Sequence, residues 1–270
     1  MTAASSTFLA ADAKSYDLLM GRWSRRLAPK FVDFVGAIAG ERVLDLGCGT
    51  GSLTSVLAER GDIRRIQGID LSAAYIAEAK ARHGNERVLF EVGDACSLAV
   101  ADHAFDHSLS MLVLQFVPRS NLAINEMRRV TRPGGTVAAA TWDQRGGAVW
   151  SRMFWDTAAA LDPRAADLRA KSCVRPMSRP GDLAQAWTTA GLTAVEHHSI
   201  SIRMEYASFD DYWLPLEGKD GPYTQYIHSL DPSFKAVLRD KVRLAYVDGD
   251  GDGPRSYASV AWVVKGKVPA

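Results

Sequence analysis

A chain of 270 residues with 47% hydrophobic and 23% charged residues has the composition of a globular protein with one large domain. Its formal net charge of +1 offers no basic surface to nucleic acid, and no run reaches the ~18 apolar residues of a membrane span. Three widely spaced cysteines make no disulfide framework, and the first ten residues lack the regions of a signal peptide. We therefore expect a cytoplasmic protein without nucleic-acid or membrane partners.

β-like and helix-like segments alternate from about residue 41 to residue 141. Apolar runs predict five strands, at 42–46, 65–70, 88–92, 105–114 and 136–142. Ser72 is the expected N-cap of the second of the helices predicted between them, at 51–60, 73–83 and 121–130. This alternation predicts a parallel sheet with helices on both faces, and such sheets bind ligands at the carboxyl ends of their strands.

Beyond residue 142 the pattern is less regular. The elements predicted there are helices at 147–178 and 181–190 and strands at 192–203 and 257–265. A mostly helical insertion, 205–250, lies between those last two strands, and we expect it to form a cap. No linker divides the chain, so we predict a single α/β domain, 1–270, with a seven-stranded, mostly parallel sheet.

Three glycines at alternate positions, Gly47, Gly49 and Gly51, follow the first strand in the run VLDLGCGTG. Glycine is needed where a ligand approaches the main chain or where φ is positive. A dinucleotide fingerprint, G-x-G-x-x-G, would require a third glycine at the position of Ser52. A carboxylate at Asp45 would repel a pyrophosphate, whereas it suits a ligand with an ammonium and a sulfonium group. The alternative is a tight turn without a ligand.

Two more carboxylates, Asp70 and Asp94, follow the next two strands. Asp70 lies 19 residues past Gly51, where a carboxylate can accept hydrogen bonds from both ribose hydroxyls of NAD or S-adenosylmethionine. Asp94 could accept a hydrogen bond from the exocyclic amine of adenine. Either residue alone could be a helix cap, but three carboxylates at three successive strand ends indicate a ligand with an adenosine portion.

The runs VLDLGCGTG, GIDLS, VGDA, FDHSLSMLVLQFVP and EMRRVTRPGGTVAAATW occur in this order within residues 40–142. In order and spacing they resemble the motifs of class I S-adenosylmethionine-dependent methyltransferases, and within them the branch that methylates small molecules such as quinones and phenols. The resemblance implies a Rossmann-like fold and S-adenosylmethionine as the cofactor. It also implies in-line transfer of the methyl group to a small-molecule acceptor, which the aromatic residues described below suggest to be apolar or aromatic.

The resemblance assigns residues to parts of the cofactor. It places the glycine loop against the methionine portion, with Asp45 near the ammonium, Asp70 at the ribose and Asp94 at the adenine. Ser110 and Met111 are implied to line the path to the methyl group. The implied cofactor-binding residues are Tyr16, Arg22, Asp45, Gly47, Cys48, Gly49, Thr50, Gly51, Asp70, Leu71, Gly93, Asp94, Ala95, Ser110, Met111 and Gln115.

The run YDLLMGRWS, within residues 12–38, is similar to the lid helix that precedes the first strand in this branch. The similarity implies that Tyr16 closes over the methionine end and that Arg22 pairs with the cofactor carboxylate. The alternative is an amphipathic helix packed on the sheet, with Arg22 in solvent. Many relatives carry His-His where this chain has Gln115-Phe116, so no histidine role is carried over to that position.

Aromatic residues are concentrated outside the cofactor-binding part, and all seven tryptophans lie outside residues 43–141. Aromatic surfaces suit an apolar or planar acceptor, although they could equally form the core of the cap itself. No catalytic residue is assigned, because displacement at a sulfonium-activated carbon depends mainly on alignment and exclusion of water. The candidate acceptor-binding residues are Trp142, Trp213, Tyr223 and His228.

The run DGDGDG at 248–253 matches the first half of an EF-hand loop, but the twelfth position is Ser259 in place of Glu, so no metal is expected. Two alternative functions stay open: an NAD(P)-dependent oxidoreductase, and a protein that binds S-adenosylmethionine but transfers nothing. The sequence does not indicate the acceptor, the methylated atom or the oligomeric state.

Overall fold

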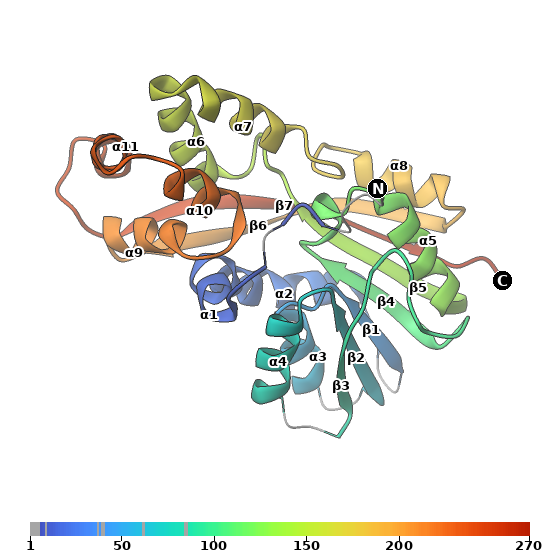
Figure 1. The fold of residues 1–270 in the computed structure, drawn as a ribbon. Coiled ribbons are helices and arrows are strands. Elements are labelled where there is room, and N and C mark those ends of the chain that lie inside the picture. The colour runs from blue at the N-terminus through green and yellow to red at the C-terminus, as the bar shows by residue number, and fades with distance from the viewer. Residues whose placement is uncertain (1–5, 9, 37, 39–40, 61–62, 84–85) are drawn as a thin grey trace.

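The computed structural model describes residues 6–8, 10–36, 38, 41–60, 63–83 and 86–270. A seven-stranded sheet runs through the molecule in the order β3-β2-β1-β4-β5-β7-β6 (Figure 1). Strands β1 to β5 pair in parallel, whereas β7 lies antiparallel between β5 and β6. The strands are β1 (Arg42–Leu46), β2 (Arg65–Asp70), β3 (Val88–Val92), β4 (Phe105–Met111), β5 (Thr131–Trp142), β6 (Thr193–Tyr206) and β7 (Arg255–Lys267). The predicted α/β fold with a mostly parallel sheet is confirmed.

The bounds of β1, β2 and β3 coincide with those predicted from the sequence. β4 ends earlier than predicted, because the chain turns into a 3-10 helix at Leu114–Phe116. β5 begins earlier than predicted, since Thr131 already pairs with Phe105 across a register shift. β6 and β7 are both longer than predicted, and their ladder reaches Tyr206 and Arg255 beneath the cap.

Helices cover both faces of the sheet because successive strand residues point to opposite sides. Val43 packs in one core with side chains of α2 (Arg22–Val35) and α3 (Ser52–Glu59). Its neighbour Leu44 packs in a second core that includes residues of α5 (Ser120–Val130) and α8 (Asp182–Thr189). Further helices are α1 (Ala13–Tyr16), α4 (Ala73–Arg82), α6 (Val149–Leu161) and α7 (Pro163–Cys173).

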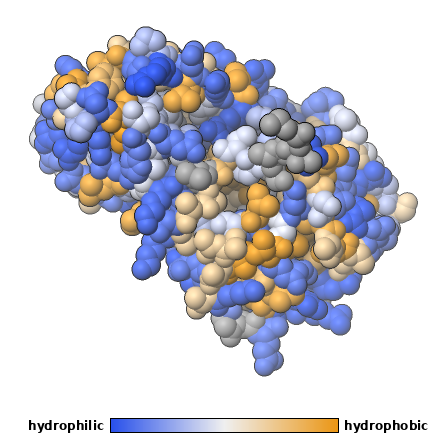
Figure 2. Space-filling model, in the orientation of Figure 1, coloured by the Kyte–Doolittle hydropathy of each residue, from blue (hydrophilic) through white to orange (hydrophobic). Residues whose placement is uncertain are grey.

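The predicted cap, 205–250, forms three α-helices between β6 and β7, α9 (Phe209–Trp213), α10 (Gly221–His228) and α11 (Pro232–Val247), and a 3-10 helix at Leu214–Glu217. These helices lie together with α6 and α7 at one end of the sheet (Figure 1). A space-filling view of the same face shows a hollow between this end and the rest of the molecule, with apolar residues gathered beside it (Figure 2).

The acidic turn at 248–253 is part of the cap's framework. Asp252 accepts a hydrogen bond from the backbone N–H of Phe209 at 2.9 Å and lies 3.6 Å from Arg243. Among the described residues, no group of three or more His, Cys, Asp or Glu is arranged to hold a metal ion. Likewise, no helix in the described part of the chain is long and apolar enough to cross a membrane.

Candidate cofactor and acceptor cavity

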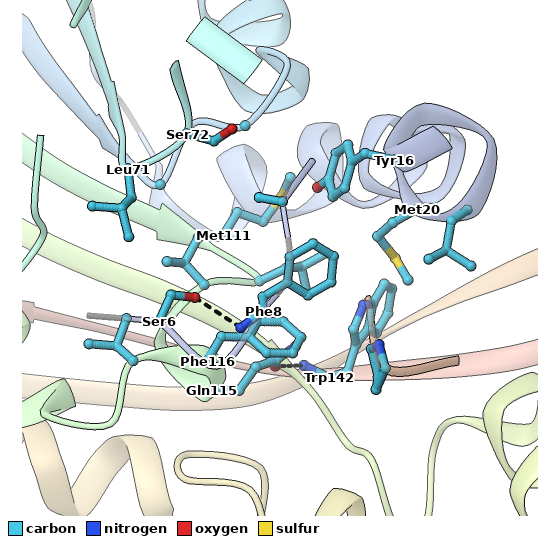
Figure 3. A pocket seen from close by; sticks show the side chains of 18 of the residues that line it. Ser6, Phe8, Tyr16, Met20, Leu71, Ser72, Met111, Gln115, Phe116 and Trp142 are labelled. Carbon is cyan, nitrogen blue, oxygen red and sulfur yellow. Dashed lines mark hydrogen bonds between the residues drawn. The ribbon is translucent and has the colours of Figure 1, made fainter. Parts of the chain in front are cut away.

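A cavity of about 340 Å³ opens at the carboxyl ends of β1, β2, β4 and β5. The sheet forms its floor, and the N-terminal segment and the cap form its walls. Figure 3 shows Leu71 and Met111 on one side of this space and Tyr16 and Met20 on the other. The cavity is lined by residues of the N-terminal segment, the strand ends, the region after β5 and the cap: Ser6, Phe8, Ala10, Tyr16, Leu19, Met20, Gly47, Gly49, Asp70, Leu71, Ser72, Tyr75, Ala95, Met111, Leu112, Val113, Gln115, Phe116, Val117, Trp142, Gln144, Trp150, Ser172, Arg175, Pro222 and Tyr223.

The glycine loop brings bare backbone to the cavity. Gly47 and Gly49 both line it, with φ of +73° and +56°, in the left-handed region that favours glycine. A Cβ atom at Gly47 would lie 2.3 Å from Cγ2 of Val113, so this position also lacks space for a side chain. At Gly49 a Cβ would meet the Tyr16 ring only at 3.7 Å. The positive φ disfavours a side chain at both positions, and Gly49 presents its backbone to the cavity.

Asp70 holds this loop from the end of β2. Its two carboxylate oxygens accept hydrogen bonds from the backbone N–H groups of Gly49, at 2.9 Å, and Ser72, at 2.8 Å. Burial raises the pKa of Asp70 above the ordinary value of an aspartate, and the two backbone donors oppose that rise. The carboxylate lines the cavity in a fixed orientation, with lone pairs left for a ligand.

Asp45 lies beneath the loop rather than in the cavity wall. Its side chain is 1% exposed, and the Thr54 hydroxyl donates a hydrogen bond to it at 2.6 Å. Burial raises the pKa of Asp45 to about 7, and the nearby charge of Asp70 contributes to that rise. Two acidic groups at one end of the cavity create a negative potential that favours a cationic ligand.

The N-terminal segment closes the cavity from above. Tyr16, Leu19 and Met20 line it from the end of α1 and from a π-helical turn, Asp17–Gly21, that leads into α2. Asp17 accepts a hydrogen bond from the hydroxyl of Thr50 at 2.7 Å, which fastens this turn to the glycine loop. Burial raises the pKa of Tyr16 to about 12, so its phenol stays protonated at neutral pH.

Residues ahead of the predicted lid and at its first position also cover the cavity. The backbone N–H of Thr7 donates to the carbonyl of Phe116 at 2.9 Å, and the Phe8 ring packs 5.0 Å from the Phe116 ring. Asp220 of the cap accepts a hydrogen bond from the N–H of Asp12 at 3.0 Å. No sequence motif indicated that this segment covers the cavity, because its contacts are with residues more than 100 positions away.

The structure does not bring Arg22 to the cavity. Its guanidinium donates to the carboxylate of Asp211 at 2.7 Å and stacks on the Trp23 ring at 4.3 Å. Arg22 therefore joins the lid helix to α9 of the cap. This placement leaves no support for the pairing with a cofactor carboxylate that the family resemblance implied.

The other residues assigned to the cofactor divide into those that line the cavity and those that support it. Leu71, Ala95, Met111 and Gln115 line it. Cys48, Thr50 and Gly51 belong to the glycine loop, and the hydroxyl of Ser110 donates to the carbonyl of Leu46 at 2.9 Å in the sheet. Gly93 and Asp94 precede Ala95, and Asp94 accepts a hydrogen bond from the N–H of Cys96 at 2.9 Å.

The four acceptor candidates separate into two pairs. Trp142 and Tyr223 line the cavity. Trp213 is fully buried in the core of the cap, with ring centroids of Phe154 and Phe209 within 6.1 Å, so the structure does not bring it to the cavity. His228 lies at the end of α10, where its ring nitrogen is 3.2 Å from the carbonyl of Glu217, and it does not line the cavity either.

The lining residues on the acceptor side that were not among the predicted candidates include Gln144, Trp150, Ser172 and Arg175. Trp150 was visible in the sequence as one of several aromatic residues. The other three follow β5 in a region whose irregular pattern gave no signal. No histidine is found among the described lining residues, and Asp70 is the one carboxylate among them.

Comparisons with known proteins agree with this geometry. A protein-family profile described as a methyltransferase domain matches residues 44–139, which hold the glycine loop and Asp70. The demethylmenaquinone methyltransferase of Beutenbergia cavernae is 38% identical over 135 residues, or 47% of this chain and 53% of that protein. Residues 44–139 are a class I S-adenosylmethionine-dependent methyltransferase domain.

Solved structures share the fold around this methyltransferase domain. Phosphoethanolamine N-methyltransferase 2 of Haemonchus contortus, in complex with S-adenosylmethionine, matches 96% of this chain and 57% of that chain, with a TM-score of 0.59 and 17% identity. The [4+2]-cyclase SpnF matches 98% of this chain and all of that chain, with a TM-score of 0.58 and 20% identity. At these identities the likeness shows the fold alone. The chain spans about half the length of the first curated relatives that it matches.

Proposed function

We propose that this protein transfers the methyl group of S-adenosylmethionine to a small, partly apolar acceptor. The observation that carries the proposal is the continuity of the cavity. One space joins Gly49 and Asp70, at the cofactor end, to Trp142 and Tyr223, at the cap end. A cofactor and an acceptor bound in this space would lie against each other with water excluded, which is the arrangement that displacement requires.

The cofactor end fits S-adenosylmethionine better than NAD(P). The sulfonium and ammonium groups are cationic, and they suit the negative potential of Asp45 and Asp70. A pyrophosphate on the glycine loop would be repelled by Asp45 in its ionised form. Asp70 would accept hydrogen bonds from the ribose, the backbone at Gly49 would approach the methionine portion, and Leu71 and Ala95 would flank the adenine.

The chain's own residues act mainly by position. When bound, the cofactor supplies a methyl carbon activated by its sulfonium. Met111 and Gln115 lie at the end of β4 and just after it, between the two ends of the cavity. Burial raises the pKa of Tyr223 to about 12, so its phenol is a hydrogen-bond donor rather than a base at neutral pH. Alignment of the acceptor with the methyl group and exclusion of water from the cavity then supply the rate enhancement. The acceptor has to be nucleophilic when it binds.

A screen with trideuteromethyl S-adenosylmethionine tests the proposal. The protein is incubated with the labelled cofactor and a panel of hydroquinones, phenols, aromatic acids and amines. The expected result is one class of product that carries the labelled methyl group, with stoichiometric release of S-adenosylhomocysteine. Cofactor binding without turnover across the whole panel would favour the non-transferring binding protein instead.

Asp45→Asn is expected to make the unliganded protein more stable at pH 8 and to weaken its binding of S-adenosylmethionine. The pKa of Asp45 is about 7 in the folded state, against about 4 in an unfolded chain. The fold therefore disfavours the ionised form, and this group lowers stability as pH rises from about 4 to 7. The asparagine oxygen can still accept the hydrogen bond from Thr54.

Urea unfolding of both proteins at pH 5 and pH 8 measures the effect. The stability gained by Asp45→Asn should be on the order of 2–3 kcal/mol larger at pH 8 than at pH 5. Asp33→Asn, at an exposed carboxylate, is the control and should show no such difference. An equal gain at both pH values, or unchanged cofactor affinity, would contradict the role given to Asp45.

A further inference from the structure

One cationic side chain, that of Arg175, lines the acceptor side of the cavity without an acidic partner. Arg175 is only partly exposed, and its guanidinium stacks over the Phe116 ring at 4.6 Å. The arginines of the preceding helices are paired: Arg152 and Arg169 with Asp156, and Arg164 with Asp162. Among the described residues, no carboxylate lies within ion-pair distance of Arg175. Arg175 therefore forms no ion pair with any carboxylate of the described residues.

The loop that carries Arg175 is fixed to the sheet. The Ser178 hydroxyl donates a hydrogen bond to the carbonyl of Arg175 at 2.7 Å. The Thr141 hydroxyl, near the end of β5, donates to the carbonyl of Met177 at 2.5 Å. Because Thr141 is fully buried, these bonds anchor the loop to the core. Arg175 is thus held at the cavity by the fold rather than resting on a surface.

An arginine in this position costs stability unless something compensates its charge. Burial lowers the pKa of Arg175 below the ordinary arginine value, although the group stays charged at neutral pH. Tyr223 is an ionisable neighbour in the cavity, but with a pKa of about 12 it is neutral and supplies no negative charge. The one carboxylate among the described lining residues, Asp70, lies at the cofactor end and forms no ion pair with Arg175, so a ligand has to supply the anion on the acceptor side.

The polar groups of three other lining residues, Gln115, Trp142 and Trp150, supply no negative charge to Arg175. Gln115 is 1% exposed, and its carboxamide oxygen accepts from the backbone N–H of Trp142 at 2.9 Å. This leaves its Nε2 group buried without a partner. The indole N–H groups of Trp142 and Trp150 are buried without partners as well. Flat apolar walls and one cation complement a planar molecule that bears an oxyanion.

Resting on the proposed function, we propose that the methyl acceptor is a planar, largely apolar monoanion whose carboxylate binds Arg175. A guanidinium presents two parallel N–H donors that match the two oxygens of a carboxylate. The single positive charge balances one negative charge, so a carboxylate fits this dry space better than a dianionic phosphate. Where the carboxylate oxygen itself takes the methyl group, its lone pair forms the new C–O bond as the C–S bond breaks to release S-adenosylhomocysteine, and no proton has to be removed.

Matched probes that differ only in charge test this inference. Wild-type protein saturated with S-adenosylhomocysteine is titrated with benzoate and benzamide, with 2-naphthoate and 2-naphthamide, and with phenyl phosphate, following tryptophan fluorescence. At least one carboxylate should bind about tenfold or more tightly than its amide. Arg175→Gln should reduce that ratio below about threefold, and Arg175→Lys should retain part of it. Arg179→Gln, at an exposed arginine four positions on, removes the same charge and should leave the ratio unchanged.

The affinity for S-adenosylhomocysteine is measured first by calorimetry. This measurement distinguishes a failure of the proposed function from a failure of the proposed carboxylate site. Absence of this binding would contradict the proposed function and, with it, this inference. Normal binding with no carboxylate preferred over its amide would overturn the inference alone. It would also be overturned if phenyl phosphate bound more tightly than both carboxylates, or if the preference survived in Arg175→Gln. Arg175→Lys provides the comparison should Arg175→Gln fail to fold.

Discussion

Asp70→Ala is expected to weaken binding of S-adenosylhomocysteine by about 30- to 1000-fold. The carboxylate at the end of β2 would accept two charge-assisted hydrogen bonds from the ribose, worth on the order of 2–4 kcal/mol together. The same oxygens hold the backbone of Gly49 and Ser72, so the substitution also loosens the glycine loop. Both effects reduce affinity in the same direction.

Calorimetry on Asp70→Ala, with thermal unfolding of the unliganded protein, checks this expectation. Glu91→Ala is the matched control, because Glu91 is an exposed carboxylate on the neighbouring strand that does not line the cavity. The control should bind like the wild type. Affinity of Asp70→Ala within threefold of wild type would contradict the assignment of the ribose to this residue.

Trp213→Ala is expected to lower the free energy of unfolding by about 3–5 kcal/mol. Trp213 is fully buried between Phe154 and Phe209, so its removal leaves a large cavity in the core of the cap. For a chain of this size, the loss corresponds to a fall in Tm of roughly 6–20 °C. Because Trp213 does not line the cavity, affinity for S-adenosylhomocysteine well below the Tm should be nearly unchanged.

Leu214→Ala serves as the control for that substitution, since Leu214 is the next residue and is 57% exposed. Its Tm should stay close to that of the wild type. If Trp213→Ala kept its Tm but lost turnover, Trp213 would contact the acceptor after all. That outcome would contradict the structural role assigned to it here.

The sequence was sufficient to predict the cofactor half of the fold. Its strands are short segments rich in apolar residues, and β1, β2 and β3 begin and end at the residues expected from them. The conformation of the glycine loop also follows locally, because alternate glycines after a strand allow positive φ at Gly47 and Gly49. Asp70 could be placed because a strand end fixes its position relative to that loop.

The acceptor half could not be predicted in the same way. Its residues come from segments far apart in the chain, such as Phe8, Arg175 and Tyr223, which only tertiary packing brings together. Trp213 and Tyr223 are both aromatic residues of the cap, yet one lies in its core and the other faces the cavity. The direction of the Arg22 side chain could not be predicted either. The guanidinium of Arg22 on the lid helix could reach the cofactor or, as observed, Asp211.

The most direct test of the central claim is a calorimetric titration of the purified chain with S-adenosylhomocysteine and, in parallel, with NADH. We expect one S-adenosylhomocysteine to bind per chain, with an affinity that Asp70→Ala weakens, and we expect no binding of NADH. Binding of NADH without binding of S-adenosylhomocysteine would contradict the central claim, because the carboxylates beneath and beside the glycine loop would then be serving a dinucleotide.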